Sequence, residues 1–170
     1  LRFEFAHHLV RVGDDSAAIT VLRADPGPQA TQFLVWLLRR RGENTEAQRY
    51  ARPFAESDHP APWAIRAMGE IAGARGDDEA LAEWMRKWTQ VEPGADSFIN
   101  YATVLARLER NEQARAVLQR VDCAGLRPVE RLRMAGLVAH VGDRERSLTI
   151  GYSALHQAPH DDQVQLMWIQ

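Results

Sequence analysis

The sequence is poor in several features that would point to redox chemistry, metal binding or a membrane. Its 170 residues include one cysteine, Cys123, so neither an intrachain disulfide nor a cysteine zinc cluster can form. No apolar run approaches the roughly 20 residues of a membrane span, and no signal peptide is visible. Lysine is nearly absent, since Lys87 stands against 20 arginines. This excess is typical of a GC-rich coding bias, and the alternative is selection for bidentate contacts.

The charge balance and the ends of the chain set further limits. Twenty-one basic and 23 acidic residues leave a net charge of -2, which argues against a nucleic-acid binder. A hydrophobic content of 45 % predicts a globular core in one domain or one short repeat array. The chain starts at Leu1 without a methionine and stops at Gln170 in mid-pattern. We therefore expect a piece of a longer protein, bacterial and cytoplasmic.

Motifs of catalysis are missing as well. The sequence has no Gly-x-Ser-x-Gly elbow, no phosphate-binding glycine-rich loop and no His-Glu-x-x-His pair. His156 and His160 have the i, i+4 spacing of a metal pair, but Pro159 ends the helix between them. We expect no catalytic residue, no metal site and no cofactor.

Helical periodicity runs along the whole chain. Apolar residues recur three and four positions apart, as in Phe33, Leu34, Leu37 and Leu38, whereas strand signals are nearly absent. The pattern predicts a partial helix from about 161 and ten helices before it, over 1–12, 15–23, 28–41, 44–56, 61–75, 78–91, 94–108, 111–121, 127–141 and 144–157.

Turn signals recur at a nearly constant interval. Turns built on Gly13, Gly42, Gly76, Glu109 and Gly142 are each closed by a small residue. These small residues are spaced 29, 33, 34 and 33 positions apart and are Ala18, Ala47, Ala80, Ala114 and Ser147. A glycine past a helix can take the left-handed conformation that ends it, and a neighbouring Asp or Asn caps the next helix. Because two helices per interval cannot bury an apolar face alone, the pairs must stack.

The spacing resembles that of the tetratricopeptide repeat (TPR) family. The third repeat carries the resemblance best, with Ile65, Met68, Gly69, Ala72, Gly76, Ala80, Trp84 and Pro93. The resemblance implies an all-α, right-handed superhelical solenoid of about five helix-turn-helix repeats. The repeats are expected over 1–26, 27–60, 61–93, 94–127 and 128–160, and a further helix starts within 161–170.

The resemblance also implies a binding surface, because the first helices of TPR repeats line a concave groove that usually binds a peptide segment. The family's groove positions correspond here to partner-binding candidates Arg11, Trp36, Arg39, Arg40, Trp63, Arg66, Arg107 and His140, among which arginines outnumber the acidic groove residues Glu70 and Asp96. The five first helices carry a net +7 and the remainder -9, which predicts a basic lining. The competing interpretation is that the tryptophans pack between repeats and the arginines form a solvated face.

We therefore expect a non-catalytic scaffold that binds an extended or helical, acidic-hydrophobic protein segment in its groove. Trp36 and Trp63 would anchor apolar side chains, and the arginines would hold carboxylates. One alternative is a helical repeat protein that binds nucleic acid, with bases stacked on tryptophan. Another is the regulatory arm of an enzyme whose catalytic domain lies outside this chain. Apolar residues in the last helix, Leu166, Met167 and Ile169, predict self-association through exposed terminal repeats.

Overall fold

The computed structural model describes residues 2–24, 27–161 and 164, and in these residues it contains ten helices and no strand. The chain divides into two compact units, Leu1–Val91 and Glu92–Gln170. The first unit holds α1 (Arg2–Arg11), α2 (Asp15–Arg23), α3 (Pro28–Arg40), α4 (Asn44–Ala55), α5 (Pro62–Ala74) and α6 (Asp78–Val91). The second unit holds α7 (Ala95–Arg107), α8 (Asn111–Leu118), α9 (Pro128–His140) and α10 (Arg144–Gln157). The predicted all-α fold is confirmed, and each predicted helix ends within three residues of the observed one.

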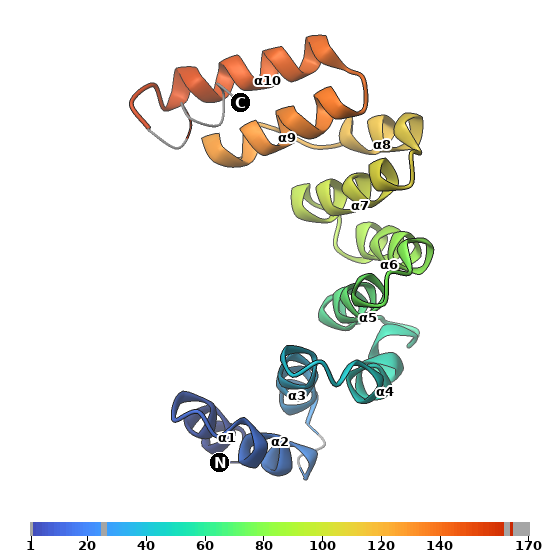
Figure 1. The fold of residues 1–170 in the computed structure, drawn as a ribbon, viewed down its shortest axis with the longest axis vertical. Helices are drawn as coiled ribbons and strands as arrows, with labels where there is room; N and C mark the ends of the chain where they lie inside the picture. The colour runs from blue at the N-terminus through green and yellow to red at the C-terminus, as the bar shows by residue number, and fades with distance from the viewer. Residues whose placement is uncertain (1, 25–26, 162–163, 165–170) are drawn as a thin grey trace. The chain divides into compact units, whose positions relative to one another are not determined.

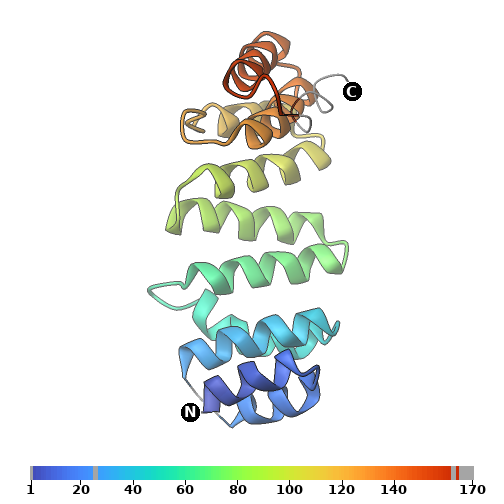
Figure 2. The same cartoon turned by 90° about the vertical axis from the view of Figure 1, so that its left-hand side faces the viewer.

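Consecutive helices pack as pairs in each unit (Figure 1). In the first unit α1 packs on α2, α3 on α4 and α5 on α6, and in the second α7 packs on α8 and α9 on α10. Successive pairs also touch, since α3 contacts α2 and α5 contacts both α3 and α4 (Figure 2). The stacking buries the apolar stripes of the first helices, including Leu34, Leu38 and Ile65. Each unit is therefore a stack of helical hairpins, as the repeat pattern predicts.

All five turns between paired helices have the same backbone conformation. Gly13, Gly42, Gly76 and Gly142 have φ between 73° and 89°, and Glu109 takes the same left-handed conformation at φ 59°. In each turn the amide after this residue bonds back to a carbonyl five positions earlier, as Arg110 does to Leu105 at 2.8 Å. Left-handed backbone costs a residue with a side chain about 1 kcal/mol, so Glu109 is strained where glycine is not.

Aspartates cap several of the second helices, as the sequence predicts. The carboxylates of Asp14, Asp77 and Asp143 accept from backbone amides three positions later, at 2.9, 3.0 and 3.2 Å. These bonds satisfy amides that the first helical turn leaves unpaired and place negative charge at the positive end of the helix dipole.

The third helical pair corrects one assignment made from the sequence. The repeat pattern predicts that Ala80 is the small contact residue of α6, but Ala80 is partly exposed and the next residue, Leu81, is buried at 8 % exposure. The larger side chain fits because glycines face it on α5. A Cβ on Gly69 would lie 3.4 Å from Leu81 Cδ1 and 2.3 Å from Met85 Cε. α5 and α6 still approach closely, but the small residue lies on α5 and the large residue on α6.

Beyond residue 161 the structure describes one position, Val164. Val164 is helical and fully buried against Leu132 and Ala154. Leu166, Met167 and Ile169, on which the expected self-association rests, lie outside the described residues. No helix within the described residues is long and apolar enough to cross a membrane.

Candidate binding pockets

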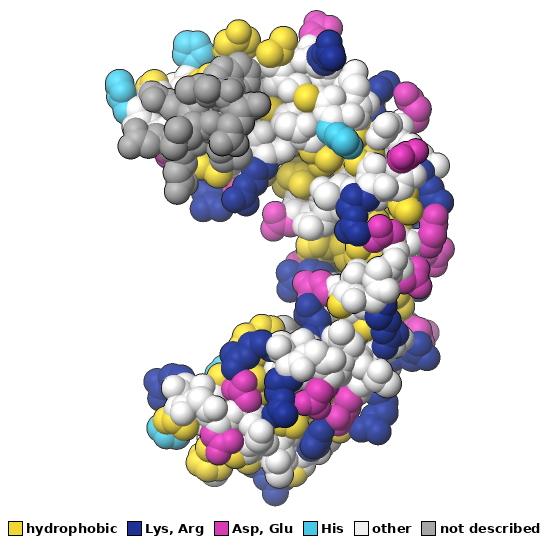
Figure 3. Space-filling view, viewed as in Figure 1, with side chains coloured by type: hydrophobic (Ala, Val, Ile, Leu, Met, Phe, Trp, Pro, Cys, Tyr) yellow, Lys and Arg dark blue, Asp and Glu magenta, His cyan; other side chains and the backbone are white. Residues whose placement is uncertain are grey.

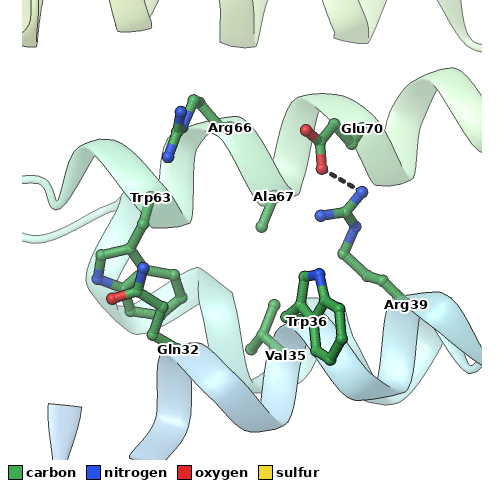
Figure 4. Close-up of a pocket in the computed structure, with 8 residues that line it drawn as sticks. All are labelled: Gln32, Val35, Trp36, Arg39, Trp63, Arg66, Ala67 and Glu70. Atoms are coloured by element: carbon green, nitrogen blue, oxygen red, sulfur yellow. Dashed lines mark ion pairs between the residues drawn. The ribbon is translucent and has the colours of Figure 1, made fainter. Parts of the chain in front are cut away.

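A pocket of about 390 Å³ lies between α3 and α5 in the first unit (Figure 4). Val35 and Ala67, which are almost fully buried, lie between its two sides. The lining on one side comprises Gln32, Trp63 and Arg66, and on the other Trp36, Arg39 and Glu70. Four of the eight candidate residues, Trp36, Arg39, Trp63 and Arg66, are therefore brought together at one place.

The charges in this pocket are unequally paired. Arg39 forms an ion pair with Glu70 across the gap between the helices, drawn as a dashed line in Figure 4. Among the described residues, no carboxylate pairs with Arg66, whose guanidinium carbon lies 5.4 Å from the centre of the Trp88 ring. Arg66 is the cation in this pocket that remains open to an acidic ligand.

A second pocket, of about 320 Å³, adjoins the first. Its lining comes from α1 and α3 and consists of Phe3, His7, Gln29, Gln32, Phe33 and Trp36. Gln32 and Trp36 line both pockets, so the two are contiguous. Glutamine is the main polar residue of the second pocket and no residue with a permanent charge lines it, so it suits an uncharged, apolar group.

Aromatic rings in the second pocket are packed against each other before any ligand arrives. Phe33 stacks on His7 with centroids 4.1 Å apart and on Trp36 at 5.6 Å, with interplanar angles of 12° and 9°. Arg40 lies over the Trp36 ring at 5.0 Å. Trp36 is nonetheless 44 % exposed, so it presents a fixed apolar surface. Such preorganisation lowers the entropy cost of binding.

The other four candidates do not line these pockets. Arg40 pairs with Asp15 of α2 besides covering Trp36. Arg11 is the exposed last residue of α1. Arg107 and His140 are exposed at the ends of α7 and α9, in the second unit. Their assignment to a binding surface stays a prediction.

Phe3, His7, Gln29 and Gln32 also fall at groove positions of the TPR pattern, whereas three other lining residues do not. Val35 and Ala67 are buried at the pocket between α3 and α5, and Phe33 is the centre of the aromatic stack. Phe33 could have been found from spacing, because Gln29, Phe33 and Trp36 are four and then three positions apart and so share one helix face. Val35 and Ala67 carry only small apolar side chains, which gave no signal distinct from core packing.

Several arginines of the first helices that were counted toward the predicted basic lining have partners in the protein. Arg41 pairs with Glu43, Arg127 pairs with Glu130, and Arg131 is buried at 4 % exposure. The Arg131 guanidinium donates to Ser153 Oγ and to the Ala124 carbonyl, both at 2.9 Å. Figure 3 shows basic and acidic side chains intermingled over the visible face of α1–α6. Arg131 therefore joins α9 to α10, whereas Arg41 and Arg127 pair with acids close to them in sequence.

A larger hollow, of about 530 Å³, lies on α4 and is lined by Thr45, Gln48, Arg49, Arg52, Pro53 and Glu56. Five of these residues lie on α4, Glu56 is the residue that follows it, and none of the six is aromatic. It lacks the convergence of several elements that marks a ligand site. In the described part of the chain, no group of three or more His, Cys, Asp or Glu side chains could hold a metal ion.

Comparison with known proteins supports the fold. No protein-family model and no curated protein matches this sequence. Solved structures do match. A thermophilic TPR protein of Thermus thermophilus is 19 % identical with a TM-score of 0.65, over 99 % of this chain and 95 % of its own. A TPR protein from Parabacteroides merdae is 16 % identical with a TM-score of 0.75, over 98 % of this chain and 69 % of its own.

A third solved structure is YrrB, described as a TPR protein with an unusual peptide-binding site. It is 12 % identical, with a TM-score of 0.66, over 99 % of this chain and 91 % of its own. At these identities the likeness concerns the fold. The chain has the all-α helical repeat fold of TPR proteins, as the resemblance implies.

Proposed function

We propose that the first unit binds an extended protein segment across α1, α3 and α5. The observation that carries this proposal is the contiguity of the two pockets through Gln32 and Trp36. One pocket is apolar and aromatic, and the other holds a cation, Arg66, without a carboxylate partner among the described residues. A segment in which an apolar side chain is followed within a few residues by an acidic one matches this arrangement. The protein would act by docking its partner, with no chemistry of its own.

The lining residues suit such a segment in their hydrogen-bonding and aromatic side chains as well as in their charge. Glutamine side chains both donate and accept, so Gln29 and Gln32 can pair with the backbone of an extended peptide. Trp63, which packs on Phe54 of α4 at 5.2 Å, presents a supported aromatic surface beside Arg66. Tryptophan and arginine are the residue types enriched at binding hot spots. YrrB, with the same fold, is described as having a peptide-binding site.

These contacts favour a protein ligand over a nucleic acid. Base stacking needs an open aromatic face, and Phe33 and Arg40 already lie against the Trp36 ring. A phosphate chain also needs several unpaired cations, whereas Arg39 and Arg40 have carboxylate partners.

The experiment measures binding of a fluorescein-labelled peptide of alternating Leu, Phe, Asp and Glu residues by fluorescence anisotropy. Trp63→Ala and Arg66→Gln should each weaken binding at least about tenfold, the usual effect of truncating a hot-spot residue. Trp84→Ala and Arg86→Gln are matched controls, because both residues lie on α6 of the same unit and line neither pocket.

Two results would contradict the proposal. One is binding that Trp63→Ala and Arg66→Gln leave unchanged while circular dichroism shows a folded protein. The other is tighter binding of single-stranded RNA than of peptide, with affinity falling steeply as salt is raised.

A further inference from the structure

Glu70 is an acidic residue in a place where an acidic ligand is expected. Its carboxylate pairs with Arg39 inside the pocket between α3 and α5, and Glu70 lines that pocket itself. The side chain of Glu70 is 51 % exposed and that of Arg39 is 27 % exposed. Figure 4 shows the pair on the side of the pocket opposite Arg66 and Trp63.

This pair differs from the ion pair made by the neighbouring arginine. Arg40 pairs with Asp15 on α2, whose side chain is 20 % exposed, and neither residue lines the pocket. The Arg40 pair therefore joins α3 to α2 without lining the pocket. The Arg39 pair lies within the pocket itself.

We propose that Glu70 occupies the position of a ligand carboxylate on Arg39 and thereby determines which segments bind. This inference rests on the proposed function of the same pocket and concerns the chemistry of the bound segment. With Glu70 in place, the pocket offers one open cation, Arg66. A second carboxylate of the segment gains Arg39 only by displacing Glu70. The pocket thus accepts a segment with a single acid readily and discriminates weakly between one acid and two.

The physical basis is exchange of one carboxylate for another on a guanidinium. A half-exposed ion pair contributes little to stability, because water screens it and two long side chains are ordered to form it. Displacing Glu70 from Arg39 therefore costs little free energy. The number of charge pairs does not increase, however, because the freed Glu70 carboxylate stays next to the ligand. Removing the charge of Glu70 leaves Arg39 free to pair with the ligand in a bidentate way.

The test compares two peptides on three proteins by isothermal titration calorimetry. The first peptide is Ac-Gly-Leu-Phe-Gly-Glu-Gly-amide with one acid, and the second replaces its final Gly by Asp. Glu70→Gln should bind the two-acid peptide about three- to tenfold more tightly than wild type, with a steeper dependence on salt. Binding of the one-acid peptide should change less. Glu83→Gln removes the same charge from α6 of the same unit, outside the pocket, and should leave both affinities unchanged.

The outcomes separate this inference from the proposed function. If wild type binds the peptides and Glu70→Gln binds the two-acid peptide no more tightly, the assignment of Glu70 is wrong and the pocket function stands. If Glu83→Gln tightens binding equally, the effect is one of net charge and the assignment is also wrong. If neither wild type nor Glu70→Gln binds either peptide, both proposals fall. The thermal unfolding midpoint of Glu70→Gln should equal that of the wild type, which would confirm that the substitution changes only the pocket.

Discussion

The indole of Trp36 lies nearly parallel to the ring of Phe33, with centroids 5.6 Å apart and planes 9° apart. Both rings come from α3, and His7 of α1 stacks on the same phenyl ring. The side chains of His7, Phe33 and Trp36 therefore have two roles. They line the second pocket, and they make a contact between α1 and α3. Phe33 supports the position of Trp36 and also joins α3 to α1.

Phe33→Leu should lower the free energy of unfolding by about 1–2 kcal/mol, because leucine fills most of the space but loses the aromatic contacts with Phe3, His7 and Trp36. It should also weaken peptide binding, since Trp36 loses its support. Urea unfolding followed by far-UV circular dichroism measures the first effect, and anisotropy measures the second. Unchanged stability would show that the stack is not a structural contact.

Glu109→Gly should raise the free energy of unfolding by up to about 1 kcal/mol, because glycine adopts the left-handed conformation of this turn without strain. Gly13→Ala is the converse change at an equivalent turn, where a Cβ has open space. It should lower stability by about the same amount. Thermal unfolding of both variants checks the pair, and a stabilising Gly13→Ala would contradict the account.

Arg131→Lys should lower the free energy of unfolding by about 1–3 kcal/mol. A lysine ammonium cannot reproduce the fork that bonds to Ser153 and to the Ala124 carbonyl, and a buried acceptor is left unpaired. Arg133→Lys is the control, because Arg133 is exposed two positions away on the same helix. Equal effects of the two changes in urea unfolding would show that the arginine fork has no structural role.

Glu130 should titrate below its ordinary pKa of 4.5. The side-chain hydrogen bond from the Arg127 guanidinium lowers the pKa most, and the bond from the Arg127 backbone amide adds to it. Because the lowered pKa belongs to the folded state, the contribution to stability is complete above 4.5 and is lost as pH falls through the folded-state pKa. NMR titration of the carboxyl carbon measures the pKa. Arg127→Gln should raise it towards 4.5, and no change would contradict the assignment.

Local signals explain why the fold could be predicted from sequence. Each turn carries its own information, such as Gly142 for the left-handed residue and Asp143 for the cap. The third pair shows the limit of this approach. There the contact residue moved by one position to Leu81, and the compensating Gly69 lies twelve residues earlier, on the facing helix.

The candidate site could be predicted only in part, for a related reason. Helical spacing is enough to place Trp36 and Arg39 on one face of α3 and to place Trp63 and Arg66 on one face of α5. It does not specify the partners of long side chains. Arg39 and Arg40 are adjacent in sequence, yet one meets Glu70 on α5 and the other Asp15 on α2. Those pairings depend on how neighbouring helices pack.

The most direct test of the central claim is the NMR footprint of the Leu/Phe/Asp/Glu peptide on the isotope-labelled protein. We predict shift changes at the indole N–H groups of Trp36 and Trp63, at the side-chain amide of Gln32 and at the guanidinium of Arg66. Footprints confined to α4 or to the second unit, with these four groups unmoved, would contradict the claim that the two contiguous pockets form the binding surface.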